Sequence, residues 1–203
     1  MSKKVLFFLI AVLTAGYAQA QNVSIGARAG VNLTSLTEKV LIGGHEMETT
    51  FKPGFQIGAV LNGARNDVFS LEGGFMFSQM GTEAQGNSET HILTLNYFDM
   101  SLHAKFRFEN FFVQAGPYVG VGLRVSEAKK YDGKKSSESY SFKDRGFRDT
   151  DFGIGAGVGY QFGPVQAALN GKIGALSIFN NNTLGGARNF GVALTATYFF
   201  ELF

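Results

Sequence analysis

The sequence has no cysteine, no tryptophan and only three prolines among its 203 residues. Without cysteine, neither disulfide bonds nor thiolate metal ligands can hold the fold together. The formal net charge is only +2, so no excess of basic residues points to nucleic acid as a partner. No apolar run reaches the roughly 20 residues that a transmembrane helix needs. These absences leave a fold that neither disulfides nor membrane-spanning helices support.

The first twenty residues have the three parts of a secretory signal peptide. Lys3 and Lys4 precede the apolar run 5–13, and Ala18-Gln19-Ala20 forms a small-x-small cleavage site. An anchoring helix is the alternative, but the run is about half the ~20 residues required for a membrane span. No cysteine follows the cleavage site, which argues against a lipoprotein. We therefore expect a signal peptide at 1–20, export through the Sec pathway and one mature domain at 21–203.

The remaining chain is rich in residues that favour strands. Of the 21 Phe in the whole sequence, all but Phe7 and Phe8 lie in this part, and so do most of the 27 Gly; Phe is a good strand former and Gly a poor helix former. Apolar and polar or glycine residues alternate in segments of about ten residues, the length that a tilted strand needs to cross a bilayer. The predicted strands number eight and cover residues 24–33, 54–62, 69–78, 98–108, 111–125, 151–162, 165–176 and 189–203.

The connections between these strands alternate between long and short. The long ones are polar and cover residues 34–53, 79–90, 126–150 and 177–188, and the short ones are residues 63–67, 109–110 and 163–164. Bacterial outer-membrane barrels have long external loops and short periplasmic turns. The pattern therefore predicts an all-β protein, an eight-stranded antiparallel up-and-down transmembrane β-barrel in the outer membrane.

The two faces of the strands differ enough to predict which one meets lipid. A soluble barrel or sandwich would expose a surface of mostly glycine with few charges, which makes a poor solvated exterior. The opposite orientation puts the aliphatic and aromatic residues in hydrocarbon, and glycine then makes room in a narrow lumen for charged side chains. Buried charges need partners, so we expect a lumen closed by an ion-pair network of Arg28, Glu72, Asp99, Lys105, Arg107, Arg124, Asp151, Lys172 and Glu201.

Motifs for catalysis, cofactors and metals are missing from the pattern. The glycine runs repeat every second residue and fit strand geometry rather than nucleotide-binding spacing, so we expect no cofactor. The three His residues lack metal-ligand spacing, so no metal site is expected. Asp99 and His103 share a face, but they lie ~13 Å apart along a strand, too far for a catalytic dyad. A barrel enzyme could still join residues across strands, for example His91 with a loop serine, and this alternative stays open.

Two stretches resemble a known family. They are Leu95 to Arg124, with Lys105-Phe106-Arg107 before a tight turn and Ala115-Gly116-Pro117-Tyr118-Val119-Gly120 after it, and the start Ile25 to Asn32. Both are similar to the outer-membrane β-barrel family of Bacteroidetes that includes PorT-like proteins. The resemblance implies a barrel fold and an outer-membrane location, and it implies no shared catalytic residues. The final Phe203 is similar to the aromatic end that such barrels present to the insertion machinery, although Phe200 and Leu202 set the apolar phase of this strand and leave Phe203 out of step.

The function expected from the sequence is therefore non-enzymatic. We expect an integral outer-membrane barrel with a role in envelope structure, in loop-mediated binding or in secretion, as an accessory protein. Its expected partners are outer-membrane lipid and the barrel-insertion machinery, and through its loops lipopolysaccharide or another envelope protein. Lys129, Lys130, Lys134 and Lys135 in the charged loop could attract lipid phosphates. A lipid-modifying hydrolase or acyltransferase and a small-solute channel are the alternatives.

Overall fold

The computed structural model describes residues 22–38, 40–42, 45–47, 49–85, 89–131, 134–179 and 186–201. Within these ranges no helix is long and apolar enough to cross a membrane. The elements in chain order are β1 (Asn22–Leu36), β2 (Val40–Ile42), β3 (His45–Met47), β4 (Thr49–Thr50), β5 (Lys52–Ala64), β6 (Phe69–Gln85), β7 (Glu89–Phe108), β8 (Phe111–Tyr131), β9 (Lys134–Tyr140), η1 (Phe142–Arg145), β10 (Thr150–Phe162), β11 (Val165–Gly174) and β12 (Asn189–Glu201). The predicted signal peptide and Phe203 lie outside the described residues.

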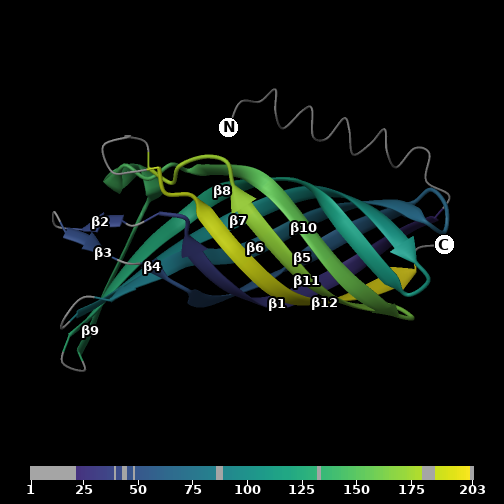
Figure 1. Ribbon diagram of the computed structural model, residues 1–203, viewed down its shortest axis with the longest axis horizontal. Helices are drawn as coiled ribbons and strands as arrows, with labels where there is room; N and C mark the ends of the chain where they lie inside the picture. The colour runs from purple at the N-terminus through teal and green to yellow at the C-terminus, as the bar shows by residue number, and fades with distance from the viewer. Residues whose placement is uncertain are drawn as a thin grey trace.

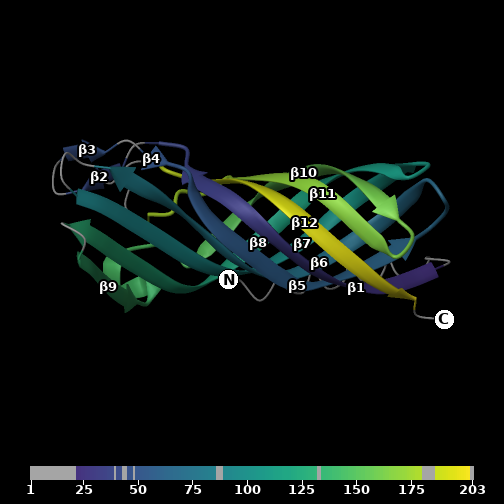
Figure 2. The same ribbon diagram turned by 90° about the horizontal axis from the view of Figure 1, so that it is seen from below.

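Eight of these strands form a closed antiparallel barrel, which confirms the predicted fold. The order around the barrel is β1, β5, β6, β7, β8, β10, β11 and β12, and the ring closes because β12 pairs with β1 and β8 pairs with β10. Figures 1 and 2 show the strands tilted around one long axis, with the short turns and the end of β12 at one end. We call this the turn end and the opposite one the loop end. Closure leaves the barrel wall without the edge strands that lipid would not tolerate.

Two of the tight turns begin with a residue of positive φ. Glu109 and Gly163 open the two-residue turns after β7 and β10, and both have positive φ values, 54° and 58°. Turns with positive φ fit the right-handed twist of adjacent strands. The turn end of the barrel is therefore compact.

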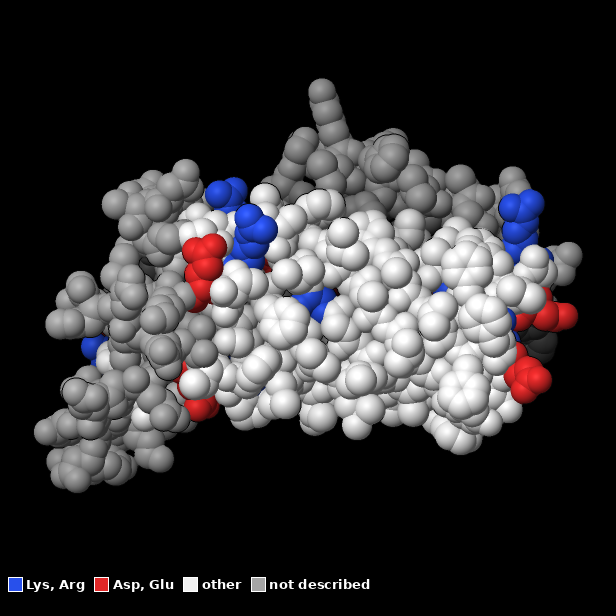
Figure 3. Space-filling view, in the orientation of Figure 1, with Lys and Arg blue, Asp and Glu red and all other residues white. Residues whose placement is uncertain are grey.

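The outer wall carries the apolar side chains, as the sequence predicted. Ile154 at the middle of β10 is 63% exposed, and the same face of other strands exposes Val31, Phe55, Phe106, Val158, Leu169, Leu194 and Phe200. In Figure 3 the charged side chains gather at the two ends of the barrel, and the wall between them is almost free of charge. This wall fits the hydrocarbon core of a bilayer.

Several strands run further toward the loop end than the alternation indicated. Most of the predicted loop 79–90 belongs to β6 and β7, and the predicted loop 126–150 contains the end of β8, all of β9 and η1. Here β9 pairs with the last seven residues of β8. These segments lie beyond the apolar wall, where neither face of a strand meets lipid, so their strands need no alternation of apolar residues. We call β9 and the loop-end parts of β6, β7 and β8 the sheet extension (Figure 1).

Candidate functional site

The candidate site is the lumen of the barrel, and its most buried charge is Glu72 on β6. The Glu72 carboxylate, which is 1% exposed, lies 2.8 Å from the Arg28 guanidinium on β1 and 2.5 Å from the Lys105 ammonium on β7. Lys105 is 0% exposed, and its ammonium also donates to Gln166 at 3.1 Å and lies 4.6 Å from the centre of the Phe112 ring. We call these five residues the turn-end cluster. It places two cations around one anion near the short turns.

A second ion pair joins opposite sides of the barrel. The Lys172 ammonium on β11 lies 2.5 Å from one carboxylate oxygen of Asp99 on β7, and the Ser78 hydroxyl donates to the same oxygen. Lys172 also lies 5.0 Å from the centre of the Tyr118 ring. Asp99 and Lys172 are 73 positions apart in the chain, so only closure of the barrel brings them together.

Asp151 lies nearer the loop end and is held by neutral donors. Its carboxylate accepts hydrogen bonds from the Tyr118 hydroxyl and the Asn189 amide, each at 3.0 Å. The same amide also donates to the Tyr97 hydroxyl at 3.3 Å. Among the described residues, no lysine or arginine forms an ion pair with Asp151. The Asp151 carboxylate is therefore solvated by side chains in place of water.

A cavity of about 80 Å³ lies between these groups. Charged and polar side chains from several strands line it, among them Arg28, Asn32, Asp99, His103, Gln114 and Lys172. Glycine and alanine line another part of its wall, at Gly155, Gly171, Gly191 and Ala193. The small residues of β10, β11 and β12 therefore leave space opposite the long side chains of β1, β7 and β8.

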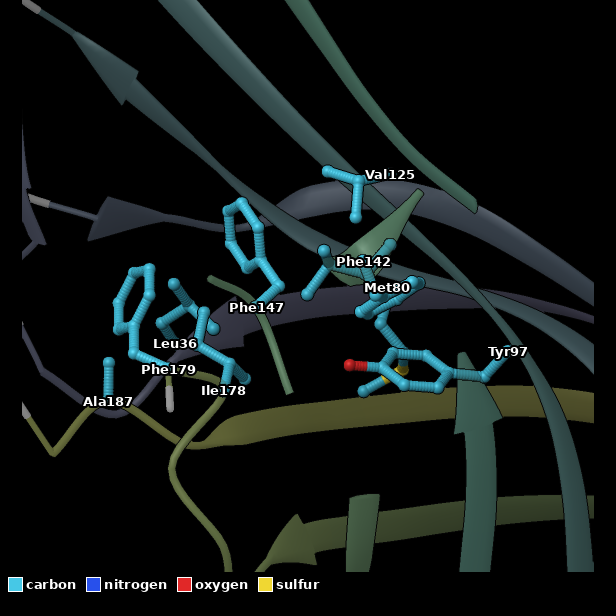
Figure 4. Packing of buried hydrophobic residues seen from close by; sticks show 10 residues of the cluster. Leu36, Met80, Tyr97, Val125, Phe142, Phe147, Ile178, Phe179 and Ala187 are labelled. Carbon is cyan, nitrogen blue, oxygen red and sulfur yellow. The ribbon is translucent and has the colours of Figure 1, made fainter. Parts of the chain in front are cut away.

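A hydrophobic cluster closes the loop end of the lumen. Inward-facing barrel residues meet loop residues there, and the cluster comprises Leu36, Met80, Leu95, Tyr97, Val125, Phe142, Phe147, Ile178, Phe179 and Ala187. Figure 4 shows how these side chains pack, with Phe142 next to Met80 and Tyr97. Phe142 from η1 is 2% exposed, and a Cβ at Gly122 would lie 2.7 Å from its ring, so glycine at this position makes room for the phenyl group. We call this cluster the loop-end cap.

Six of the nine charges expected in the lumen lie there in a definite arrangement. Five of them form the two ion-paired groups and the sixth, Asp151, accepts hydrogen bonds from neutral side chains. Arg107 is half-buried at the turn end and forms no ion pair with a described residue. The side chain of Glu201 lies outside what the structure describes.

Arg124 does not point into the lumen, which corrects the expectation from the alternation. It is exposed, and so is its neighbour Leu123. The ladder between β7 and β8 shifts here, because Asn96 pairs with Arg124 whereas Tyr97 pairs with Gly122, and Leu123 is the extra residue. An extra residue in one strand reverses the alternation of the residues that follow. Val125 consequently takes the inward position and joins the loop-end cap.

The neutral members of the site were not predicted from the sequence. Tyr118 and Gln114 lie in the inward phase of β8, a signal that could have included them with the charges. Phe142, Phe147 and Phe179 were hidden in stretches interpreted as polar loops. Phenylalanine is usually buried, so three phenylalanines within these polar segments could have predicted a buried cap.

The lumen offers little for catalysis among the residues described. Asp99 binds Ser78 and Lys172 instead of His103, and no hydrogen bond joins His103 to another described side chain. No group of three or more His, Asp or Glu residues that could hold a metal ion occurs in the described ranges. What the arrangement can do is fill the barrel with paired charges at one end and apolar side chains at the other.

Solved structures of three outer-membrane proteins are similar to this chain. Neisserial surface protein A is 13% identical, with a TM-score of 0.53, over 89% of this chain and all of that one. Ail of Yersinia pestis is 15% identical with a TM-score of 0.49 over the same shares. The outer membrane protease OmpT of Escherichia coli is 12% identical with a TM-score of 0.35, over 89% of this chain and 97% of that one.

No curated protein matches the chain. The model of the outer membrane protein beta-barrel domain family matches residues 18–179. That range includes all strands from β1 to β11. The chain therefore belongs to the outer membrane protein beta-barrel domain family.

Proposed function

We propose that this protein is a non-catalytic outer-membrane barrel that binds another envelope protein through its sheet extension. The observation that carries the proposal is that the lumen is filled at both ends while three barrel strands continue past the apolar wall and β9 pairs with one of them there. Glu72 and Lys105 are almost completely buried at the turn end, and Phe142 is buried at the loop end. A filled lumen leaves the external strands as the part of the molecule that is available to partners.

The length of the strands supports this role. A tilted strand crosses a bilayer in about ten residues, whereas β7 has 20 and β8 has 21. The pairing of β8 with β10 ends at Val121, and from Val125 onward β8 pairs with β9 instead. Ser136, Ser137 and Ser139 of β9 are exposed. A sheet edge in this position can bind an extended segment of another protein by main-chain hydrogen bonds.

Site-specific cross-linking in intact outer membranes tests this binding role. A photoreactive residue at Ser137 should form an adduct with an envelope protein, because this position lies on the exposed edge strand. The matched control is Val113, which is exposed on the lipid-facing wall of the same barrel and should give no such adduct. Equal adducts at both positions, or an adduct with lipopolysaccharide alone at Ser137, would contradict the proposal.

The two alternative functions make different predictions. A small-solute channel would conduct in planar bilayers, and we expect no steady conductance because the turn-end cluster and the loop-end cap occupy the lumen. A lipid-modifying enzyme would turn over labelled lipid A or phospholipid, and we expect no product from the refolded protein. Conductance or turnover by the purified barrel would replace the binding role with the corresponding alternative.

We further propose a narrower family and a route to the membrane. The Lys105-Phe106-Arg107 and Ala115 to Gly120 stretches support membership of the PorT-like barrels of Bacteroidetes and hence an accessory role in secretion. The basic and apolar pattern of residues 1–20 supports Sec export, and Phe203 supports recognition by the insertion machinery. N-terminal sequencing of the mature protein should begin at Gln21, and removal of Phe203 should slow insertion of the barrel. A mature protein that retains residues 1–20 would contradict the signal peptide.

A further inference from the structure

The cavity in the lumen is lined by polar atoms that the protein itself leaves without hydrogen-bond partners. These atoms are Asn32 Oδ1, Asp99 Oδ1, Gln114 Oε1 and both ring nitrogens of His103, none of which bonds to another described residue. Asn32, Asp99 and Gln114 are all more than nine-tenths buried. A buried polar atom without a partner is costly, and four such side chains around one cavity indicate a molecule that hydrogen-bonds to them.

Hydrogen bonds that end on backbone carbonyls determine how the side-chain amides of Asn32 and Gln114 are oriented. The Asn32 amide nitrogen donates to the Gln79 carbonyl at 2.8 Å, so its oxygen is the free atom. Gln114 Nε2 donates to Asn170 Oδ1, Asn170 Nδ2 donates to Thr195, and the Thr195 hydroxyl donates to the Ala168 carbonyl. Because a carbonyl can only accept, this relay runs in one direction and leaves Gln114 Oε1 free. The cavity therefore presents three free acceptor oxygens, together with one acceptor and one N–H donor on the ring of neutral His103.

The charges around the cavity favour an uncharged ligand. The three buried cations Arg28, Lys105 and Lys172 are matched in number by the three carboxylates of Glu72, Asp99 and Asp151. An added ion would introduce an uncompensated charge into a buried space, which is strongly unfavourable. A neutral molecule with several O–H or N–H groups satisfies the free acceptors without this cost.

The volume of the cavity sets the size of the molecule. About 80 Å³ corresponds to roughly three water molecules at liquid density. We propose that the cavity is a binding site for a small uncharged molecule rich in hydrogen-bond donors, of the size and chemistry of ethylene glycol. The proposal is independent of the sheet extension, because the site lies inside the barrel wall.

Solute titrations followed by NMR test the chemistry of the site. The isotope-labelled mature protein is refolded in detergent micelles with increasing ethylene glycol, and the side-chain amide signals of Asn32 and Gln114 are measured. We expect their shifts to saturate, with half-saturation in the millimolar range. Acetonitrile is the matched control solute, because it is of similar size and neutral but has no donor, and it should give no saturable shift. Shifts that never saturate, or that acetonitrile reproduces, would show that water alone fills the cavity and would overturn the proposal.

Two variants locate the binding. Ala193 lines the cavity and pairs with Asn32 on β1 and Asn170 on β11, so Ala193→Leu should fill the space and abolish the saturable shift. The control Ala196→Leu changes an exposed residue of the same strand and should leave the shift intact. Gln114→Leu removes one free acceptor and should weaken binding about tenfold, followed at Asn32; it also serves if Ala193→Leu fails to refold. Unchanged binding in Gln114→Leu, or in a folded Ala193→Leu, would place the solute elsewhere and refute the site.

Discussion

Replacing Glu72 with glutamine should destabilise the barrel more than any single loss of a cation at the turn-end cluster. The substitution keeps the shape of the side chain but leaves Arg28 and Lys105 buried without their anion. Removing one partner of a buried ion pair typically costs about 3–5 kcal/mol. Lys105 keeps its contacts with Gln166 and the Phe112 ring, so we expect a loss near the lower bound, about 3 kcal/mol.

Replacing a cation of the cluster instead of its anion shows whether the loss of stability comes from the unpaired cations. Lys105→Met leaves Glu72 paired with Arg28 at 2.8 Å, so it should cost only about 1–2 kcal/mol. Glu109→Gln, in the exposed turn after β7, is the control and should change stability by less than about 0.5 kcal/mol.

Urea unfolding of the refolded protein measures these free energies. The chain has no tryptophan but seven tyrosines, so the unfolding can be followed by tyrosine fluorescence or circular dichroism and checked by heat-modifiable migration on gels. A Glu72→Gln variant within about 1 kcal/mol of the parent protein, or a Lys105→Met variant that is equally destabilised, would refute the arrangement of two cations around one buried anion.

Three further predictions concern the cap, the outer wall and the bulge. Phe142→Ala should open the loop-end cap, at a cost of about 3 kcal/mol; limited proteolysis should cut the loops faster while the gel shift on boiling persists, and unchanged cleavage would contradict a packed cap. Ile154→Arg should cost about 2–4 kcal/mol in lipid vesicles because it puts a charge in hydrocarbon, and a neutral effect in urea unfolding would contradict the orientation of the wall. Arg124→Ala should change stability by less than about 0.5 kcal/mol, whereas Arg28→Ala, which leaves Glu72 paired with Lys105, should cost about 1–2 kcal/mol; equal losses would mean that Arg124 is buried after all.

The described residues fill the two ends of the lumen in different ways. The turn-end cluster pairs buried charges, and the loop-end cap packs apolar side chains. The cavity that remains between them is small. We therefore expect this interior to hold a small molecule rather than to pass solutes.

The strands of the sheet extension could not be predicted from the alternation of apolar residues. Inside the membrane each strand meets lipid on one side and lumen on the other, so its residues alternate visibly. In the sheet extension neither side meets lipid, and the residues of β9 are polar on both faces. The strand β9 forms because it pairs with β8. A local pattern of apolar residues does not predict this pairing.

The sequence alone determined the barrel, its strand number and its lipid-facing wall, because the demand for one apolar and one luminal face is local and repeats every two residues. It also put Arg28, Glu72, Asp99, Lys105 and Lys172 on the inward face. Only the tertiary structure decided which of these charges meet, since the stagger of the closed barrel brings Asp99 to Lys172 across 73 residues of chain. One unpaired residue in β8 turned Arg124 outward, and packing between loops made a cap of phenylalanines. Both depend on partners distant in the chain, which a local pattern does not contain.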